Sequence, residues 1–237
     1  MEHIALGNID IELTKKNIKN VHLSVHPPNG RVTISAPKRM DLETIRVYAS
    51  SKLNWIKKQQ KKIASQNREP IREYVNRESH YYQGKRYLLQ INEKQSPPNV
   101  KLTFEKIVLS VRPHSTKKKR MSVLDEWYRK KLKEKIPNMI RTWEKEIPVK
   151  VSEFGIKKMK TRWGSCNINK KRIWLNLELA KKPIECLEYI LVHEMVHLLE
   201  KNHNKKFYSY INRFYPNWKH SKDLLDRLPV SHNNWNY

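Results

Sequence analysis

Two histidines and a glutamate are spaced in this sequence like the ligands and the general base of a hydrolytic metal centre. They form the segment His193-Glu194-Met195-Val196-His197. Residues at i and i+4 share one face of a helix, so both imidazoles can reach a single Zn²⁺ ion. Glu194 would lie beside the metal, where its carboxylate can accept a proton from a metal-bound water. The spacing therefore predicts a metal site that activates water.

A third ligand is expected shortly after this helix. A catalytic zinc ion takes three protein ligands and leaves a fourth position for water. His203, six residues after His197, is the best candidate because it comes just after the helix turns away. Glu200 competes for the position, but three residues after His197 it would have to reach back. His220 and His232 are more remote candidates.

The segment around the motif is apolar and locally acidic. From Pro183 to Glu200 there are four glutamates and no lysine or arginine, although the net charge of the chain is +26. Apolar residues surround the motif on most sides, which is typical of a buried helix. Burying the two imidazoles and the carboxylate without partners would cost roughly 2–7 kcal/mol for each group, which a metal ion and its water would offset. The alternative is two core histidines bonded to backbone carbonyls, with Glu194 paired to an arginine.

The chemistry follows from these parts. Zinc lowers the pKa of its bound water toward about 7, and Glu194 accepts the proton. The hydroxide would attack a carbonyl or a phosphoryl centre. Arg162 and the backbone N–H groups around Gly164 and Ser165 are candidates for stabilising the developing negative charge. Zinc is the expected ion, although another divalent ion would also fit, and Cys166 is expected to be a buried, inert thiol.

Composition limits the class of protein. The 237 residues suffice for one large domain or two modest ones. Two cysteines are too few for a disulfide framework, and the N-terminus shows no apolar leader, so a cytoplasmic location is expected. No apolar run is long enough to span a bilayer. The 49 Lys and Arg against 23 Asp and Glu favour association with nucleic acid or nucleotides, unless they reflect a lysine-rich genome.

Hydrophobic periodicity predicts an α+β fold with two regions. The first is an N-terminal β-rich basic region, residues 1–115, in which two strands of alternating apolar and polar residues meet at a hairpin around Asn29-Gly30. Apolar residues at helical spacing then predict a helix over 41–66, and a strand pattern returns over 72–111. In the catalytic region, residues 116–237, a basic loop at 117–120 is expected to precede a helix over about 122–143. Around the motif we expect strands at 150–160 and 172–177, a turn at 162–166, and helices from Pro183 to about 201 and over 205–214.

The C-terminal motifs resemble those of the YgjP-like metallopeptidase family, relatives of the SprT and WLM zinc proteases. The matching segments are Arg162-Trp163-Gly164-Ser165-Cys166, Ile173-Trp174-Leu175-Asn176, the motif helix from Tyr189 to Leu198, and Asn202-His203 with Phe207. The resemblance extends to the N-terminal hairpin and the helix with Trp55-Ile56. It implies a minigluzincin-like zincin core with a sheet packed on the metal-binding helix. It also implies zinc on His193, His197 and His203, with Glu194 catalytic.

Three functions stay open at this point. The first is a zinc-dependent peptidase acting on a protein or peptide, which could be one held on DNA. The second is a metal-dependent nucleoside-triphosphate pyrophosphatase of the UTP type, because members resembling this family have been linked with that activity. The third is a nucleic-acid-associated protein with a structural metal, in which lysines 57–62 and the aromatics Tyr81, Tyr82 and Tyr87 would contact single strands. Sheet packing is the simpler reading of those tyrosines. None of the three involves a membrane.

Overall fold

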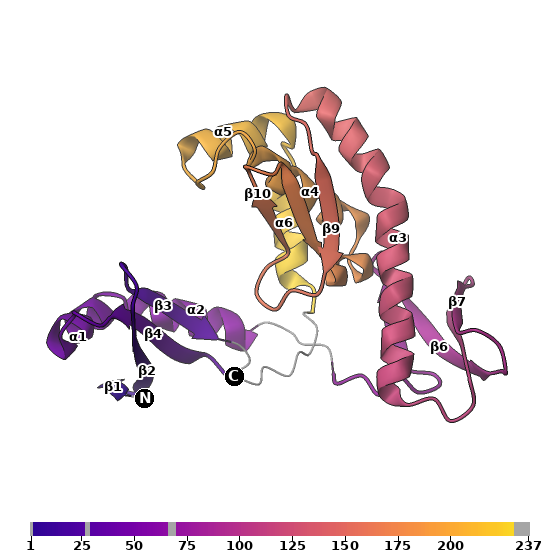
Figure 1. The fold of residues 1–237 in the computed structure, drawn as a ribbon, viewed down its shortest axis with the longest axis horizontal. Helices are drawn as coiled ribbons and strands as arrows, with labels where there is room; N and C mark the ends of the chain where they lie inside the picture. Colours follow the sequence, from indigo (N-terminus) through magenta and orange to yellow (C-terminus); the bar gives the residue numbers. More distant parts are fainter. Residues whose placement is uncertain (1, 27–28, 66–69, 230–237) are drawn as a thin grey trace. The chain divides into compact units, whose positions relative to one another are not determined.

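The computed structural model describes residues 2–26, 29–65 and 70–229, and shows a mixed α+β chain (Figure 1). These residues form three small β-sheets and six α-helices. The chain divides into two compact units, with the division between residues 68 and 69. The α+β class predicted from periodicity is thus confirmed. None of the helices in the described ranges is long and apolar enough to cross a membrane.

The first unit contains a four-stranded sheet and two helices. Its elements are β1 (Glu2–Leu6), β2 (Ile9–Lys16), β3 (His22–His26), β4 (Arg31–Pro37), α1 (Leu42–Ser51) and α2 (Leu53–Ser65). The strand order is β1-β2-β4-β3, with β2 parallel to β4 and both outer pairs antiparallel. The alternating residues Ile9, Ile11 and Leu13 of β2 are buried and form a core with Ile45 and Ile56 of the helices.

Two expectations for this unit can be compared with the structure. The hairpin is confirmed, because β3 and β4 pair antiparallel from His26 opposite Arg31, and Gly30 takes a left-handed φ of 72° in the turn. Pro27 and Pro28 lie outside the described residues. The single helix over 41–66 is wrong, because the chain breaks at Lys52. Its backbone N–H bonds to Ala49 O instead of continuing the α-helical pattern, and α2 starts at the next residue.

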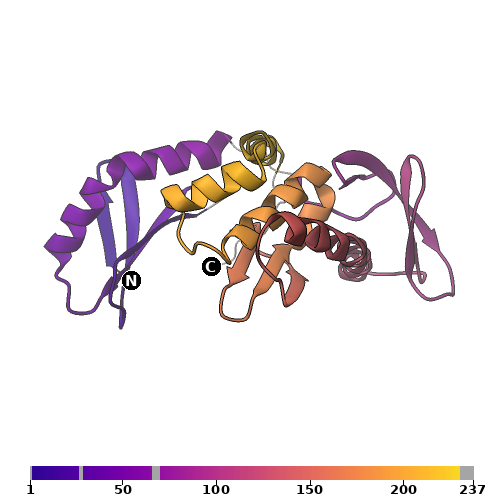
Figure 2. The ribbon, with the colours of Figure 1, turned by 90° about the horizontal axis from the view of Figure 1, so that it is seen from above.

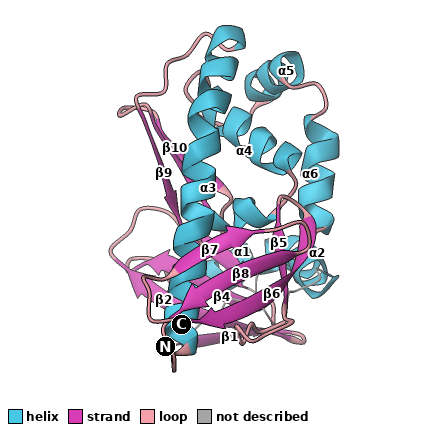
Figure 3. Cartoon of the chain, turned by 90° about the vertical axis from the view of Figure 1, so that its right-hand side faces the viewer, coloured by secondary structure: helices cyan, strands magenta, loops and turns pink. Residues whose placement is uncertain are grey.

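The second unit opens with another four-stranded sheet. It comprises β5 (Ser79–Tyr82), β6 (Lys85–Glu93), β7 (Asn99–Leu102) and β8 (Lys106–Val111), in the order β5-β6-β8-β7 (Figure 3). As in the first sheet, the central pair is parallel and the outer pairs are antiparallel. Tyr82 and Tyr87 are only 9% exposed and belong to the core, so the interpretation of these two as sheet-packing residues is confirmed.

Helix α3 (Lys117–Glu146) follows this sheet and packs against it. The basic loop expected at 117–120 is wrong, because the Thr116 side chain accepts a hydrogen bond from Lys119 N and starts the helix there. Pro137 lies inside the helix. Buried residues of β6, β8 and α3 share one hydrophobic core with the motif helix. The sequence-based boundary near residue 115 therefore falls within a single core, and the structural division lies at residue 68 instead.

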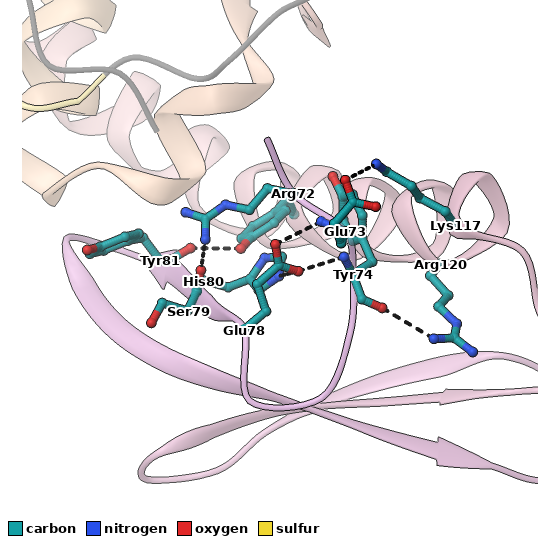
Figure 4. A network of polar contacts seen from close by, with 10 residues as sticks. Arg72, Glu73, Tyr74, Glu78, Ser79, His80, Tyr81, Lys117 and Arg120 are labelled. Atoms are coloured by element: carbon teal, nitrogen blue, oxygen red, sulfur yellow. Dashed lines mark hydrogen bonds and ion pairs between the residues drawn. The ribbon is translucent and has the colours of Figure 1, made fainter. Parts of the chain in front are cut away.

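A buried polar network holds residues 72–80 beside the start of α3 (Figure 4). The Glu78 carboxylate accepts hydrogen bonds from the backbone N–H groups of Glu73 at 2.9 Å and Tyr74 at 2.6 Å, and it lies 3.2 Å from His80 Nε2. The Arg72 guanidinium donates to the Ser79 carbonyl. These bonds allow the buried His80 and the partly buried Glu78 to satisfy each other inside the unit.

The rest of the second unit is a three-stranded sheet with its helices. Its elements are β9 (Glu153–Lys157), β10 (Gly164–Asn167), β11 (Arg172–Asn176), the 3₁₀ helix η1 (Leu177–Lys181), α4 (Ile184–Val196), α5 (Lys205–Phe214) and α6 (Trp218–Arg227). The sheet order is β10-β11-β9, and α4 packs on β10 and β11 (Figure 2). The turn expected at 162–166 is wrong for its second half, because Gly164–Asn167 pairs with β11 as an edge strand.

Candidate metal centre and active site

Helix α4 presents the two histidines of the motif on one face. Its apolar residues are buried nearly all round, as the sequence predicts. The helix ends earlier than expected, at Val196, and His197 is its C-cap residue with helical backbone angles. The His197 N–H bonds to His193 O at 3.3 Å, so the i, i+4 relation of the two side chains survives in the last turn. Both imidazoles therefore leave the helix at its C-terminal end.

His203 joins them from the connection between α4 and α5. The backbone turns back after Val196, and Asn204 caps α5 by accepting a hydrogen bond from Phe207 N at 3.0 Å. This places His203 Nε2 only 2.9 Å from His193 Nε2. The potential ligand atoms of His193, His197 and His203 all lie within 4.8 Å of one another. The three residues that the sequence separates by up to ten positions therefore meet at one point.

The competing ligands do not join this group. Glu200 instead offers its backbone carbonyl to His197 Nδ1 at 3.1 Å, and its carboxylate accepts from Asn202 N at 3.2 Å. His220 lies on α6 outside the cluster, and His232 is outside the described residues.

The histidine cluster fits a metal ion such as zinc. Burial and the neighbouring imidazoles lower the pKa of His193 to about 3, and burial also lowers the pKa of His197, so both rings are neutral and carry free lone pairs. His197 donates Nδ1–H to the Glu200 carbonyl, which leaves Nε2 as the lone-pair nitrogen. His193 Nδ1 is buried and has no hydrogen-bond partner among the described residues. Three converging imidazoles, with neutral rings at His193 and His197, are a typical catalytic zinc ligand set.

Phe207 supports the cluster from the first turn of α5. Its fully buried ring has its centroid 4.9 Å from that of His193 and 4.7 Å from those of His197 and His203. A rigid aromatic wall of this kind restricts the rotation of all three imidazoles. Phe207 entered the sequence analysis only through the family resemblance, because one apolar residue of an amphipathic helix gives no signal of such a role.

Glu194 points from α4 toward β10. Its side chain is 6% exposed, and a Cβ atom placed on Gly164 would lie 2.7 Å from Glu194 Oε1 and 2.8 Å from its Cγ. Glycine at 164 therefore allows the edge strand to approach the carboxylate, whereas sequence reasoning assigned it to a tight turn. Burial raises the pKa of Glu194 to about 8, and the positive charge of Arg162 opposes that rise. Such a carboxyl group exchanges protons near neutral pH, as a general base must.

The histidines and Glu194 line one cleft of about 990 Å³. Residues 161–169, which include β10, form one wall, while α4 with Lys201 and His203 forms the other. Arg162 is exposed in this cleft, where it can meet a bound substrate. Cys166 also lines it, but burial and the nearby Glu194 raise the pKa of its thiol to about 11. The thiol is therefore neutral, and it is not part of the histidine cluster. The expectation that Cys166 is buried is wrong, because the residue is half-buried at the wall of the cleft.

Asn176 organises the loop that carries Arg162, a role that the sequence analysis missed. The side chain is 4% exposed, and its Nδ2 group donates to Met159 O at 2.9 Å and to Arg162 O at 2.8 Å. Its Oδ1 atom accepts from Glu178 N at 3.2 Å at the start of η1. The signals available were its place near the end of the strand predicted over 172–177 and within a segment that carries the family resemblance. One amide thus fixes the backbone of one wall of the cleft.

Comparison with known families decides the family of this chain. The model described as "YgjP-like, metallopeptidase domain" matches residues 19–228. The chain belongs to this family. Membership in the YgjP-like family indicates a hydrolase of the metallopeptidase type, and the resemblance carried by the sequence motifs is confirmed.

Other comparisons add less. No curated protein matches the chain significantly. Among solved structures, the chain is similar to the metallopeptidase zymogen abylysin of Pyrococcus abyssi, at 19% sequence identity and a TM-score of 0.35. That match covers 39% of this YgjP-like chain and 90% of the abylysin chain.

Proposed function

We propose that this YgjP-like chain is a zinc-dependent peptidase in which Glu194 is the general base. The observation that carries the proposal is the meeting of three histidines beside a buried glutamate in one open cleft. His193, His197 and His203 would hold the ion. Bound zinc supplies Lewis acidity and a water that ionises near neutral pH. These roles are the ones expected from the motif spacing.

The protein groups around the cluster have separate tasks. Glu194, held between α4 and β10, would take a proton from the attacking water and later deliver it to the leaving amine. Arg162, exposed in the same cleft, would face the negative charge that develops on the substrate carbonyl. Asn176 would keep the Arg162 loop in place. Phe207 would hold the imidazoles in their orientations.

The cleft suits an extended peptide. β10 is an edge strand of the sheet and lines the cleft beside Glu194, so a substrate backbone can pair along it. All residues of the proposed site fall within 116–237, the predicted catalytic region. The packing of β10 and β11 against α4 supports a minigluzincin-like core for this region. The nucleotide alternative stays a prediction, for which Arg162 and Lys201 in the cleft would provide phosphate contacts.

The test compares wild type with Glu194→Gln and with Glu185→Gln, a matched control on the exposed first turn of α4. Metal content is measured by mass spectrometry, and activity is measured on casein, a fluorogenic peptide library and a panel of nucleoside triphosphates. We expect one zinc per chain in all three proteins. Peptide hydrolysis should fall by about 10²–10⁴-fold in Glu194→Gln alone. Cleavage of UTP without cleavage of any peptide would show that the peptidase assignment is wrong. Metal binding without any hydrolysis would favour a structural ion.

A further inference from the structure

A second groove lies in the same unit, between the start of β7 and the N-terminal half of α3. Its volume is about 850 Å³. Residues 98–100 form one wall, and a face of α3 between residues 119 and 134 forms the other. We call it the α3 groove. It shares no lining residue with the histidine cleft, and the hydrolytic site does not use it.

The α3 groove carries unbalanced positive charge. Lys119, Lys130 and Lys133 line it, and none of the three forms an ion pair within the described ranges. The adjacent Lys130 and Lys133 are separated by about one helical turn, so their ammonium groups can act on the same ligand. Lysines left unpaired around a concave surface attract a negatively charged partner.

The acidic residues of the groove do not cancel this charge. Glu126 also lines the groove, but its carboxylate is 2.5 Å from the Arg129 guanidinium. Glu134 is likewise paired, with its carboxylate 2.8 Å from Lys131 Nζ. Each of these glutamates is thus neutralised by a cation that does not line the groove. The three lysines remain in excess.

The floor of the α3 groove is apolar. Val100 of β7 and Val123 of α3 are only partly buried, and both pack on the hydrophobic core at the base of the groove. Trp127 also lines the groove and is 8% exposed. Its ring is already engaged, with centroids 5.0 Å from Tyr82 and 4.9 Å from Tyr128. No open aromatic face is therefore available for a nucleic-acid base, while aliphatic side chains can be buried on the valines.

The strand that borders the groove can accept an extended partner. β7 is an edge strand in the order β5-β6-β8-β7. Edge strands recognise extended peptides through backbone hydrogen bonds, with alternate side chains directed to one face. The lining part of α3, residues 119–134, extends about 22 Å along the helix axis. That length corresponds to about seven residues of extended chain.

We propose that the α3 groove is a docking site for an extended acidic peptide segment of a partner protein, in which carboxylates alternate with aliphatic side chains. The carboxylates meet Lys119, Lys130 and Lys133, and the aliphatic side chains cover Val100 and Val123. The proposal does not rest on the peptidase assignment, because the groove and the histidine cleft have separate residues. Loss of either function leaves the other measurable.

The test measures binding by fluorescence anisotropy with a labelled seven-residue peptide in which glutamate alternates with valine. Lys130→Glu/Lys133→Glu reverses two groove charges. Lys118→Glu/Lys145→Glu is the matched control, with the same charge change at exposed positions of α3 outside the groove. We expect affinity to fall at least about tenfold in the groove variant and less than about twofold in the control. Val100→Thr, nearly isosteric within the strand, should weaken binding several-fold without changing the salt dependence.

Further probes decide between occupants. A peptide with serine in place of valine should bind weakly, and a thymidine oligonucleotide should not displace the valine peptide at physiological salt. Equal losses in the two charge-reversal variants would overturn the proposal in favour of general electrostatic attraction. Displacement by the oligonucleotide would assign the groove to nucleic acid instead. No binding of the peptide to wild type, at low salt, would also overturn it. Circular dichroism verifies that each variant is folded.

Discussion

Replacing Gly164 by alanine tests whether the edge strand positions Glu194. The added Cβ would lie 2.7 Å from Oε1, 2.8 Å from Cγ and 3.0 Å from Cδ of Glu194. Ordinary contacts are 3.4–4 Å, so an overlap of at least 0.6 Å has to be relieved. The Cγ atom is close to the backbone of a buried helix, and it cannot move as freely as the end of a surface side chain. The carboxylate must therefore turn away from its present position.

The expected effect is large on catalysis and smaller on stability. A displacement of roughly 1 Å of a catalytic group costs about 10²-fold in rate, which is about 2.7 kcal/mol of activation free energy. Overpacking of this kind lowers the free energy of unfolding by about 1–3 kcal/mol. The metal content should stay unchanged, because the three atoms nearest to the new methyl group all belong to Glu194 and none to a histidine. The peptidase assay, metal analysis and urea unfolding measure these three quantities.

A double-mutant cycle with Glu194→Ala isolates the steric cause. Without the side chain beyond Cβ, the methyl group on residue 164 meets no glutamate atom, so Gly164→Ala should cost less than about 0.5 kcal/mol of unfolding free energy in that background. If the cost is the same in both backgrounds, the close approach of β10 to Glu194 is not what requires glycine. If the single variant keeps full peptidase activity, Glu194 does not need its present position.

Two further predictions concern buried polar groups. Asn176→Ala should lower the free energy of unfolding by about 2–4 kcal/mol and raise KM, because the Met159 and Arg162 carbonyls of the loop lose their hydrogen-bond donor. The control is Asn167→Ala, at an exposed position. Equal losses of stability in the two variants would refute the role of Asn176 in the loop. Burial lowers the pKa of His80 to about 4, although the nearby Glu78 carboxylate acts to raise it. In the unfolded chain the imidazole has a pKa near 6.5, so it binds a proton there before it does so in the folded protein. The free energy of unfolding therefore falls as the pH drops from about 6.5 toward 4. Urea unfolding at pH 7.5 and pH 5 should show about 2 kcal/mol less pH-dependent loss in His80→Gln than in wild type, and equal losses would contradict this assignment.

Several elements of the two units could be predicted because their signals are local. The helix over 205–214 was placed at its observed bounds, since a strong apolar stripe and Pro216 define it. The β3–β4 hairpin follows from Asn29-Gly30. Errors arose where a cap or a pairing partner decides the structure. Thr116 extends α3 into the lysine run, and pairing with β11 turns the expected 162–166 turn into a strand from Gly164 onward.

The repeated sheet was also invisible in the sequence. Both four-stranded sheets have a parallel central pair flanked by antiparallel pairs, and each precedes a helical segment. No fixed period shows this, because the loops differ in length and the strands share only alternation. The boundary near residue 115 was drawn where strands give way to helix. The hydrophobic core extends across that boundary, because residues of β6 and β8 belong to the same buried cluster as residues of α3.

The sequence by itself predicted the chemistry that we propose for this protein. The spacing of His193, Glu194 and His197, within an apolar helix of a basic chain, predicts a bound metal ion, a general base and a water between them. The reason is that two residues four positions apart lie on the same face of a helix. Only the tertiary structure decided what completes the site. It brings His203 Nε2 to 2.9 Å from His193 Nε2 and places Gly164 against the Glu194 side chain. It also fixes the Arg162 loop through a hydrogen bond from Asn176 Nδ2 to the Arg162 carbonyl. These contacts join different elements, and their geometry depends on packing that no local pattern encodes.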